Sequence, residues 1–183
     1  MLERHVFLIG MPGSGKSSLG RKVAATLKLP YVDMDRKIAE VLNCVSVADV
    51  YERWGEEVFT RAETNLLIQL SWDSPGLVST GGNTVMDPEN RELMRNLGAI
   101  VLIDRPLELI LSDIKLDDRR PNLIDKGKDE VEKLYWERID TYRACADLVL
   151  VNDGSYYSGV AALERLLKTR FRLDTPSKGA ESR

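Results

Sequence analysis

A glycine-rich stretch near the N-terminus carries the clearest chemistry in this sequence. Residues 10–17 read Gly-Met-Pro-Gly-Ser-Gly-Lys-Ser and fit the phosphate-binding pattern G-x-x-x-x-G-K-[ST]. Glycines let such a loop turn its backbone N–H groups toward phosphate oxygens. The pattern predicts that Lys16 reaches the β- and γ-phosphates of a nucleotide and that the Ser17 hydroxyl contacts Mg²⁺. The expected nucleotide-binding residues are Gly13, Ser14, Gly15, Lys16, Ser17 and Ser18.

The segments on either side of this loop are those that its function requires. Residues 6–9 form an apolar run typical of a buried strand, and residues 18–27 have the apolar spacing of an amphipathic helix. A dinucleotide-binding fingerprint is the rival interpretation of Gly13-Ser14-Gly15. That fingerprint needs Gly or Ala at position 18, where this chain has Ser18. We therefore expect a strand, a phosphate-binding loop and a helix.

Two aspartates follow a second predicted strand at residues 31–33. Asp33 and Asp35 would lie at the carboxyl end of this strand, where ligands bind in open α/β sheets. Their position indicates one carboxylate near a metal and one near a substrate hydroxyl. The alternative is that Asp35 only caps a helix that starts at Arg36. The residues alone leave both interpretations open.

Two further segments could bind a ligand or could be ordinary turns. Paired glycines, Gly81 and Gly82, follow the strand predicted at 77–79 and would permit a close backbone approach. Residues 115–129 are rich in charge and turn formers, and they include Arg120. That segment is either a solvated loop or a lid whose arginines close over transferring phosphate.

Strands and helices alternate along the chain. The predicted strands are 6–9, 31–33, 77–79, 100–103 and 148–151, and the helices are 18–27, 36–42, a short one after Ser46, 56–70, one from Asp87, 106–114, 130–143 and 158–167. This order predicts a single α/β domain over residues 1–173, with a central parallel sheet of five strands. The polar residues 174–183 read as a disordered tail.

Composition excludes several classes of function. The net charge of −3 over 183 residues argues against nucleic acid or an anionic membrane surface as the main partner. No signal peptide or apolar run of membrane-spanning length occurs. Cys44 and Cys145 are far apart, which favours buried, reduced thiols in a cytoplasmic protein. His5 is the only histidine, and we expect it at the surface and outside the chemistry.

In this order the motifs resemble the shikimate kinase family over nearly the whole chain. They are Gly10 to Ser17, Asp33-x-Asp35, Gly55-Glu56 with Phe59 and Glu63, Gly81-Gly82, Arg120-Pro121, and Arg138 with Tyr142 and Ala146-Asp147. The resemblance implies a P-loop fold similar to nucleoside monophosphate kinases, with a substrate-binding segment and a lid. It also implies transfer of the ATP γ-phosphate to the 3-hydroxyl of shikimate, with Mg²⁺, in the synthesis of aromatic amino acids. A monomer is the default assembly.

The resemblance also assigns roles by position. Asp35 would bond shikimate hydroxyls and orient or deprotonate the attacking one, and Asp33 would act around Mg²⁺ through water. Arg138 would hold the carboxylate, for which the planar guanidinium is suited. Arg120 would lie on the phosphates. The implied catalytic residues are Lys16, Asp35 and Arg120, and the implied substrate-binding residues are Asp35, Arg61, Gly81, Gly82 and Arg138.

Four departures from the family pattern concern the acceptor side. Thr60 stands where the family has a carboxylate-binding arginine, and Arg61 comes one residue later. Asn83 replaces a third glycine, Asn122 replaces a common leucine, and residues 139–141 lack the usual proline. A kinase for another hydroxylated acid, or a nucleotide-binding regulatory protein without catalysis, are the alternatives.

Overall fold

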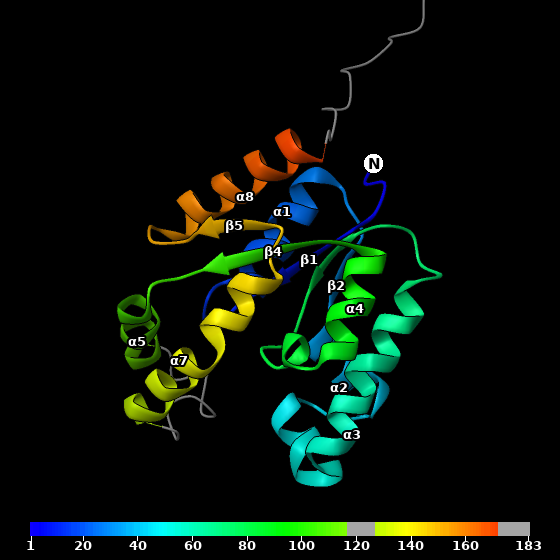
Figure 1. The fold of residues 1–183 in the computed structure, drawn as a ribbon, viewed down its shortest axis with the longest axis vertical. Helices are drawn as coiled ribbons and strands as arrows, with labels where there is room; N and C mark the ends of the chain where they lie inside the picture. The colour runs from blue at the N-terminus through cyan, green and yellow to red at the C-terminus, as the bar shows by residue number, and fades with distance from the viewer. Residues whose placement is uncertain (117–126, 172–183) are drawn as a thin grey trace, which may run out of the picture.

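In the computed structural model, which describes residues 1–116 and 127–171, five parallel strands form one sheet in the order β2-β3-β1-β4-β5 (Figure 1). The strands are β1 (His5–Ile9), β2 (Tyr31–Asp33), β3 (Leu77–Ser79), β4 (Gly98–Asp104) and β5 (Leu148–Val151). Every pair of neighbouring strands is parallel. The predicted α/β fold with a five-stranded parallel sheet is confirmed.

Helices cover both faces of this sheet. They are α1 (Lys16–Leu27), α2 (Met34–Val41), α3 (Val47–Leu70), the 3₁₀ turn η1 (Thr84–Met86), α4 (Pro88–Leu97), α5 (Leu107–Leu116), α7 (Gly127–Cys145) and α8 (Tyr156–Arg170). Figure 1 shows α1 and α8 together above the sheet, and α3, α4 and α7 below it. The arrangement is therefore a three-layer sandwich of helices, sheet and helices.

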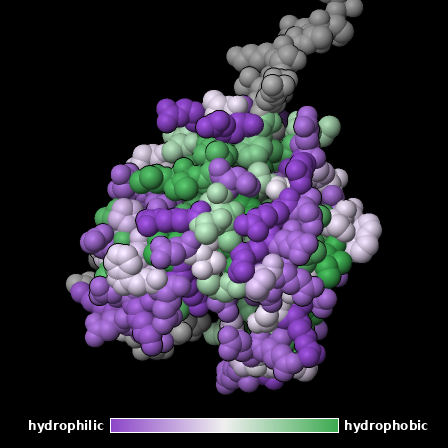
Figure 2. Space-filling view, viewed as in Figure 1, coloured by the Kyte–Doolittle hydropathy of each residue, from purple (hydrophilic) through white to green (hydrophobic). Residues whose placement is uncertain are grey.

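Successive side chains of the central strand, β1, point alternately into two hydrophobic cores on opposite faces of the sheet. Phe7 and Ile9 of β1 pack into the core with α2, α3, α4 and α7, while Val6 and Leu8 pack into the core with α1 and α8. Because β1 is buried on both faces, it reads in the sequence as one continuous apolar run. At the sheet's edge, Figure 2 shows a hydrophobic patch over β5, where Val149 is half exposed.

The order of the strands places the P-loop at the centre of the sheet. β1 lies between β3 and β4: the chain leaves β1 for β2 and β3 on one side, and after β3 it crosses to β4 and β5 on the other. A crevice at such a switch point is where open α/β sheets bind ligands. The loop of residues 10–15 runs from the end of β1 into α1 at this point.

Several predicted boundaries needed correction. α1 begins at Lys16 rather than residue 18, and α2 begins at Met34 because Asp33, not Asp35, caps it by accepting the Arg36 N–H. The predicted break at Gly55 is confirmed: its φ of 79° and ψ of 173° are not helical, and they divide α3 into two helical segments. The predicted lid of 115–129 overlaps the end of α5 and the start of α7, and the rest of it lies outside the described residues, as does the predicted tail of 174–183.

The expectation of a surface position for His5 was wrong. Its side chain is buried in β1, where Nδ1 accepts a hydrogen bond from the Gly76 N–H and Nε2 lies 2.9 Å from the Leu70 carbonyl oxygen. Two backbone partners satisfy both ring nitrogens, so the residue ties β1 to the segment before β3. Cys44 and Cys145 are buried and unpaired, as predicted. In residues 1–116 and 127–171 no helix is long and apolar enough to cross a membrane.

Candidate active site

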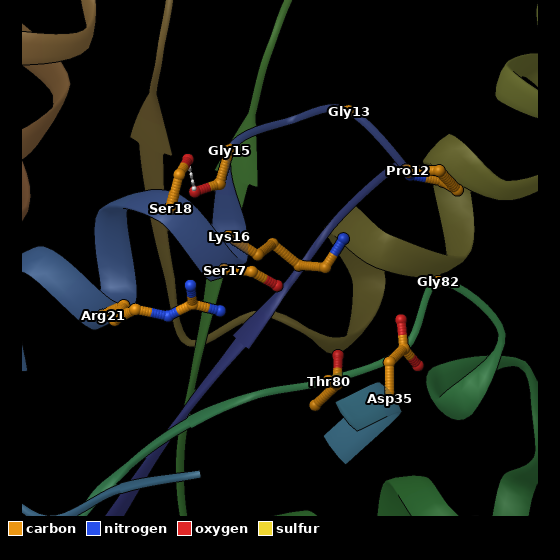
Figure 3. Close-up of a pocket in the computed structure, with 10 residues that line it drawn as sticks. All are labelled: Pro12, Gly13, Gly15, Lys16, Ser17, Ser18, Arg21, Asp35, Thr80 and Gly82. Atoms are coloured by element: carbon orange, nitrogen blue, oxygen red, sulfur yellow. Dashed lines mark hydrogen bonds between the residues drawn. The ribbon is translucent and has the colours of Figure 1, made fainter. Parts of the chain in front are cut away.

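The P-loop forms one wall of an open pocket of about 400 Å³ (Figure 3). Gly15 has φ 100°, a left-handed conformation that favours glycine, and it directly precedes α1. The pocket therefore lies at the N-terminus of α1, where backbone N–H groups and the helix dipole attract anions. The predicted phosphate-binding residues at 13, 15, 16, 17 and 18 all line the pocket, whereas Ser14 is buried and does not line it.

Lys16 is held in place by its own loop. Its Nζ donates hydrogen bonds to the carbonyl oxygens of Gly10 at 2.8 Å and Met11 at 3.0 Å, and its side chain is buried. Figure 3 shows the amine extending from α1 toward the side of the pocket that holds Asp35 and Gly82. The cation is thus positioned between the phosphate loop and the opposite wall.

Ser17 and Asp33, the predicted metal-binding residues, carry oxygen atoms of the type that Mg²⁺ prefers, and both line a pocket adjoining the P-loop. The Ser17 hydroxyl lines the pocket and lies 3.5 Å from the Ser79 hydroxyl. An Asp33 carboxylate oxygen lies 3.6 Å from the Arg21 guanidinium. Among the described residues, no three His, Cys, Asp or Glu side chains gather as a metal cage. A kinase site commonly holds Mg²⁺ with one or two side chains plus substrate phosphates and water, so these two residues fit that ion.

Asp35, which is partly buried, lines the opposite end of the pocket, and the buried carboxyl group of Glu63 lies close to it. Asp35 Oδ1 and Glu63 Oε1 each lie 2.7 Å from the point where a Cβ of Gly81 would stand. Thr84 donates a hydrogen bond from its hydroxyl to Glu63. Burial raises the pKa of Asp35, and the nearby Lys16 charge opposes that rise. Both carboxyl groups therefore occupy the space that a side chain at position 81 would need, and glycine there lets α2 and α3 bring them together.

Arg138 and Tyr142 of α7 complete this end of the site. The Tyr142 hydroxyl donates to the Gly82 carbonyl oxygen at 2.6 Å, and Arg138 Nη1 lies 3.5 Å from the same oxygen. These contacts fasten α7 to the glycine pair that follows β3. The structure thus brings Asp35, Gly81, Gly82 and Arg138 together across the pocket from Lys16.

Sequence reasoning missed three residues that line the same pocket: Pro12, Arg21 and Thr80. Arg21 could have been found, because it stands four residues after Ser17 and so shares its face of α1. Thr80 directly follows β3, at the same edge of the sheet as the other ligand-binding loops. Glu63 was noted as part of a motif but was not assigned to the site.

Comparisons with known proteins agree with this geometry. The family model described as shikimate kinase matches residues 12–167. The chain belongs to the shikimate kinase family. A shikimate kinase of Clostridium beijerinckii is 37% identical over 152 residues, which cover 83% of this chain and 88% of that protein. One of Enterococcus faecalis is 33% identical and is matched over 79% of this chain and 86% of its own length.

Solved structures give the same result. Shikimate kinase from Acinetobacter baumannii, solved in complex with shikimate, superposes with a TM-score of 0.81 at 25% identity, over 92% of this chain and 93% of that one. The enzyme from Aquifex aeolicus gives 0.76 at 28% identity, over 91% and 97%. As a member of the shikimate kinase family, the protein is an ATP-dependent kinase of a small molecule, and its predicted family is confirmed.

Arg61, predicted to hold the substrate, does not reach the site. Its guanidinium pairs with Glu57 at 2.6 Å on the outer face of α3, where both side chains are more than three-quarters exposed. Helix geometry explains this position. Phe59 and Glu63 are four residues apart, so they share one face of α3, and both are buried. Arg61 lies midway between them in the sequence and therefore projects from the opposite face. Arg61 therefore does not replace the family arginine, whose position holds Thr60. Arg120 lies outside the described residues.

We expect Arg61→Ala to leave the KM for the acceptor within about twofold of the wild-type value, because an exposed i,i+4 ion pair contributes little. Steady-state kinetics with the acceptor as varied substrate would measure this. Arg138→Ala is the matched arginine control, and its KM should rise strongly. A large increase in KM for Arg61→Ala would show that α3 presents this side chain to the substrate.

Glu63 makes the stability of the protein depend on pH. The pKa of Glu63 is raised from 4.5 to about 7, mainly because its carboxyl group is buried. Because the folded-state pKa exceeds that of the unfolded chain, the neutral carboxyl stabilises the fold at low pH. This stabilisation is lost as the pH rises from 4.5 through about 7.

We therefore expect Glu63→Gln to melt several degrees above the wild type at pH 8 and near it at pH 5. Thermal melts at both pH values would measure the difference. Glu92→Gln, on the exposed face of α4, is the control and should show no such pH dependence. A Glu63→Gln variant that is equally destabilised at both pH values would contradict the raised pKa.

Proposed function

We propose that this protein transfers the γ-phosphate of ATP to the 3-hydroxyl of shikimate, in the pathway that leads to aromatic amino acids. One observation carries the proposal: Lys16 of the phosphate loop and Asp35, the predicted acceptor carboxylate, line the same pocket. Family membership and the likeness to the shikimate-bound enzyme of Acinetobacter baumannii support this acceptor. ATP and shikimate would thus meet between α1 and the start of α2.

The reaction follows from charge and position. The loop N–H groups bind the phosphates, and Lys16 neutralises the charge that develops as the bond to the leaving ADP oxygen breaks. Asp35 orients the 3-hydroxyl, whose oxygen forms the new bond to phosphorus, and accepts its proton. Because burial raises the pKa of Asp35, the carboxylate is a better proton acceptor than an exposed aspartate. Holding both reactants in line accounts for much of the rate.

Ser17 would bind Mg²⁺ directly and Asp33 through water. When bound, this ion neutralises charge on the β- and γ-phosphates. Tyr31 and Arg21 position these two residues: the Tyr31 hydroxyl donates to the Ser17 carbonyl oxygen at 3.1 Å, and Arg21 lies beside Asp33. These contacts hold β2 against α1 next to the proposed metal site.

Other parts of the proposal extend the family resemblance. Residues 115–129 would act as a lid within one domain spanning residues 1–173, with Arg120 on the transferring phosphate. A monomer is the default assembly for the active form. Two buried, unpaired cysteines fit a reducing compartment, so we place the protein in the cytoplasm.

A second candidate is a kinase of another cyclic hydroxy acid. The observation that favours it is the neutral Thr60, together with the outward position of Arg61, which leaves Arg138 as the described arginine at the acceptor end. A panel of cyclic and sugar acids, tested at equal Mg²⁺ and ATP with ADP release as the readout, separates the two. We expect shikimate to have the highest kcat/KM. A panel member with a higher kcat/KM would instead be assigned as the acceptor.

A further inference from the structure

An asparagine near the end of the chain is hydrogen-bonded to the P-loop. Asn152 directly follows β5 and is buried. Its Nδ2 donates a hydrogen bond to the carbonyl oxygen of Ser14 at 2.9 Å, across 138 residues of sequence. Because a carbonyl oxygen can only accept, the nitrogen of the amide must be the atom that faces the loop. Asn152 does not line the pocket itself, so any effect it has on a ligand passes through the loop.

Two glycines leave the space that the Asn152 amide occupies. A Cβ at Gly15 of the P-loop would lie 3.0 Å from Asn152 Nδ2, and a Cβ at Gly159 of α8 would lie 2.6 Å from its Oδ1. The second distance is well below the separation at which non-bonded atoms attract each other. A larger residue at position 159 would therefore displace the amide. The side chain is thus fitted between the P-loop and α8.

The backbone of Asn152 is held in place as well. Its N–H donates to the Asp104 carbonyl oxygen at 2.8 Å, and its own carbonyl oxygen accepts a hydrogen bond from Arg105 Nη1 at 2.9 Å. The Arg105 guanidinium is only 13% exposed and pairs through Nη2 with Asp113 of α5 at 2.8 Å. Neighbouring segments of the fold therefore fix Asn152 independently of the loop, so it can serve as an anchor for a loop rich in glycine.

The direction of the Ser14 carbonyl sets the direction of the next N–H group. The Ser14 C=O and the Gly15 N–H belong to one planar trans peptide, in which the two groups point in opposite directions. A hydrogen bond that draws the carbonyl toward Asn152 and α8 directs the N–H away from them, toward the pocket that Gly15 lines. Glycine restricts its backbone little, so without this bond the peptide could rotate at low cost.

We propose that Asn152 is a positioning residue for the nucleotide: it holds the Ser14 carbonyl and thereby preorganises the Gly15 N–H to bind phosphate. The inference concerns the nucleotide side of the site, so it holds whichever acid is the acceptor. Phosphate is bound to the loop before and during transfer, so the contribution is the same in the ground state and in the transition state. It should therefore appear in the KM for ATP more than in kcat.

The test is Asn152→Leu, which keeps the branched shape of the side chain without charge and removes the donor. We expect the dissociation constant of ADP with Mg²⁺, measured by isothermal titration calorimetry, to rise about fivefold to tenfold, because one donor to phosphate loses its fixed direction. The KM for ATP should rise by the same factor, with kcat within about twofold of the wild-type value. Asn65→Leu is the matched control on the exposed face of α3 and should bind ADP as the wild type does.

Gly159→Ala tests the same contact from the side of α8, and it keeps the proposal testable if Asn152→Leu does not fold. This variant retains the amide, but its Cβ would take the space of Oδ1 and push the amide out of place. We expect weaker ADP binding here too. Wild-type affinity for ADP in a folded Asn152→Leu, or in Gly159→Ala, would overturn the inference, even if the melting temperature fell. A wild type that does not bind ADP would overturn nucleotide binding at the P-loop itself.

Discussion

Lys16→Ala is expected to lower kcat for phosphoryl transfer by about a thousandfold or more, with little effect on folding. The Lys16 amine is buried against the phosphate loop and is directed toward the acceptor side of the pocket. There it would neutralise charge that increases as the γ-phosphate moves. The loss should therefore appear in kcat, because the interaction strengthens in the transition state.

Steady-state kinetics at saturating ATP and acceptor would measure the effect of Lys16→Ala. Lys22→Ala is the control, since Lys22 lies on the exposed face of the same helix. Circular dichroism of both variants would establish that α1 and the sheet are retained. A folded Lys16→Ala variant with a kcat near that of the wild type would exclude catalysis at the P-loop.

Asp35→Asn is expected to lower kcat by about a hundredfold to ten-thousandfold, the range for loss of a general base. The substitution retains size and a hydrogen-bonding oxygen, but it removes the ability to accept the hydroxyl proton. The wild-type rate should fall as the pH drops through the raised pKa of Asp35, since the protonated form cannot accept that proton. The variant should lose this pH dependence along with its activity.

The pH dependence of kcat and KM for the acceptor, measured for both proteins, separates two roles of Asp35. A small loss in kcat with a large rise in KM would mean that Asp35 positions the acceptor and accepts no proton. Asp73→Asn, in the exposed turn after α3, is the control. It should leave both profiles unchanged.

The features that the sequence predicted well are those set by short-range physics. The apolar runs of β1 and β4 are buried strands because a parallel sheet covered on both faces needs continuous hydrophobic residues. The P-loop was predictable because its glycines and Lys16 are required at fixed spacing. The capping residues Ser46 and Asp87 were found because each side chain accepts a backbone N–H of the helix it starts.

The features that the sequence did not predict depend on long-range packing. His5 is buried because segments about 70 residues away supply both of its backbone partners. The outward direction of Arg61 follows from the rotation of α3 about its axis, which Phe59 and Glu63 fix by facing inward. The break at Gly55 was predicted, but the contact between Tyr51 and Phe59 depends on the angle between the two helical segments, which helical periodicity does not specify.

The most direct test of the proposed function is transfer of ³²P from γ-labelled ATP to shikimate in the presence of Mg²⁺. The hydroxyl that is phosphorylated would be identified by NMR in a parallel reaction with unlabelled ATP. We predict that the wild type phosphorylates the 3-hydroxyl and that Lys16→Ala does not. Hydrolysis of ATP without label in shikimate, or phosphate on a different hydroxyl, would contradict the proposed reaction.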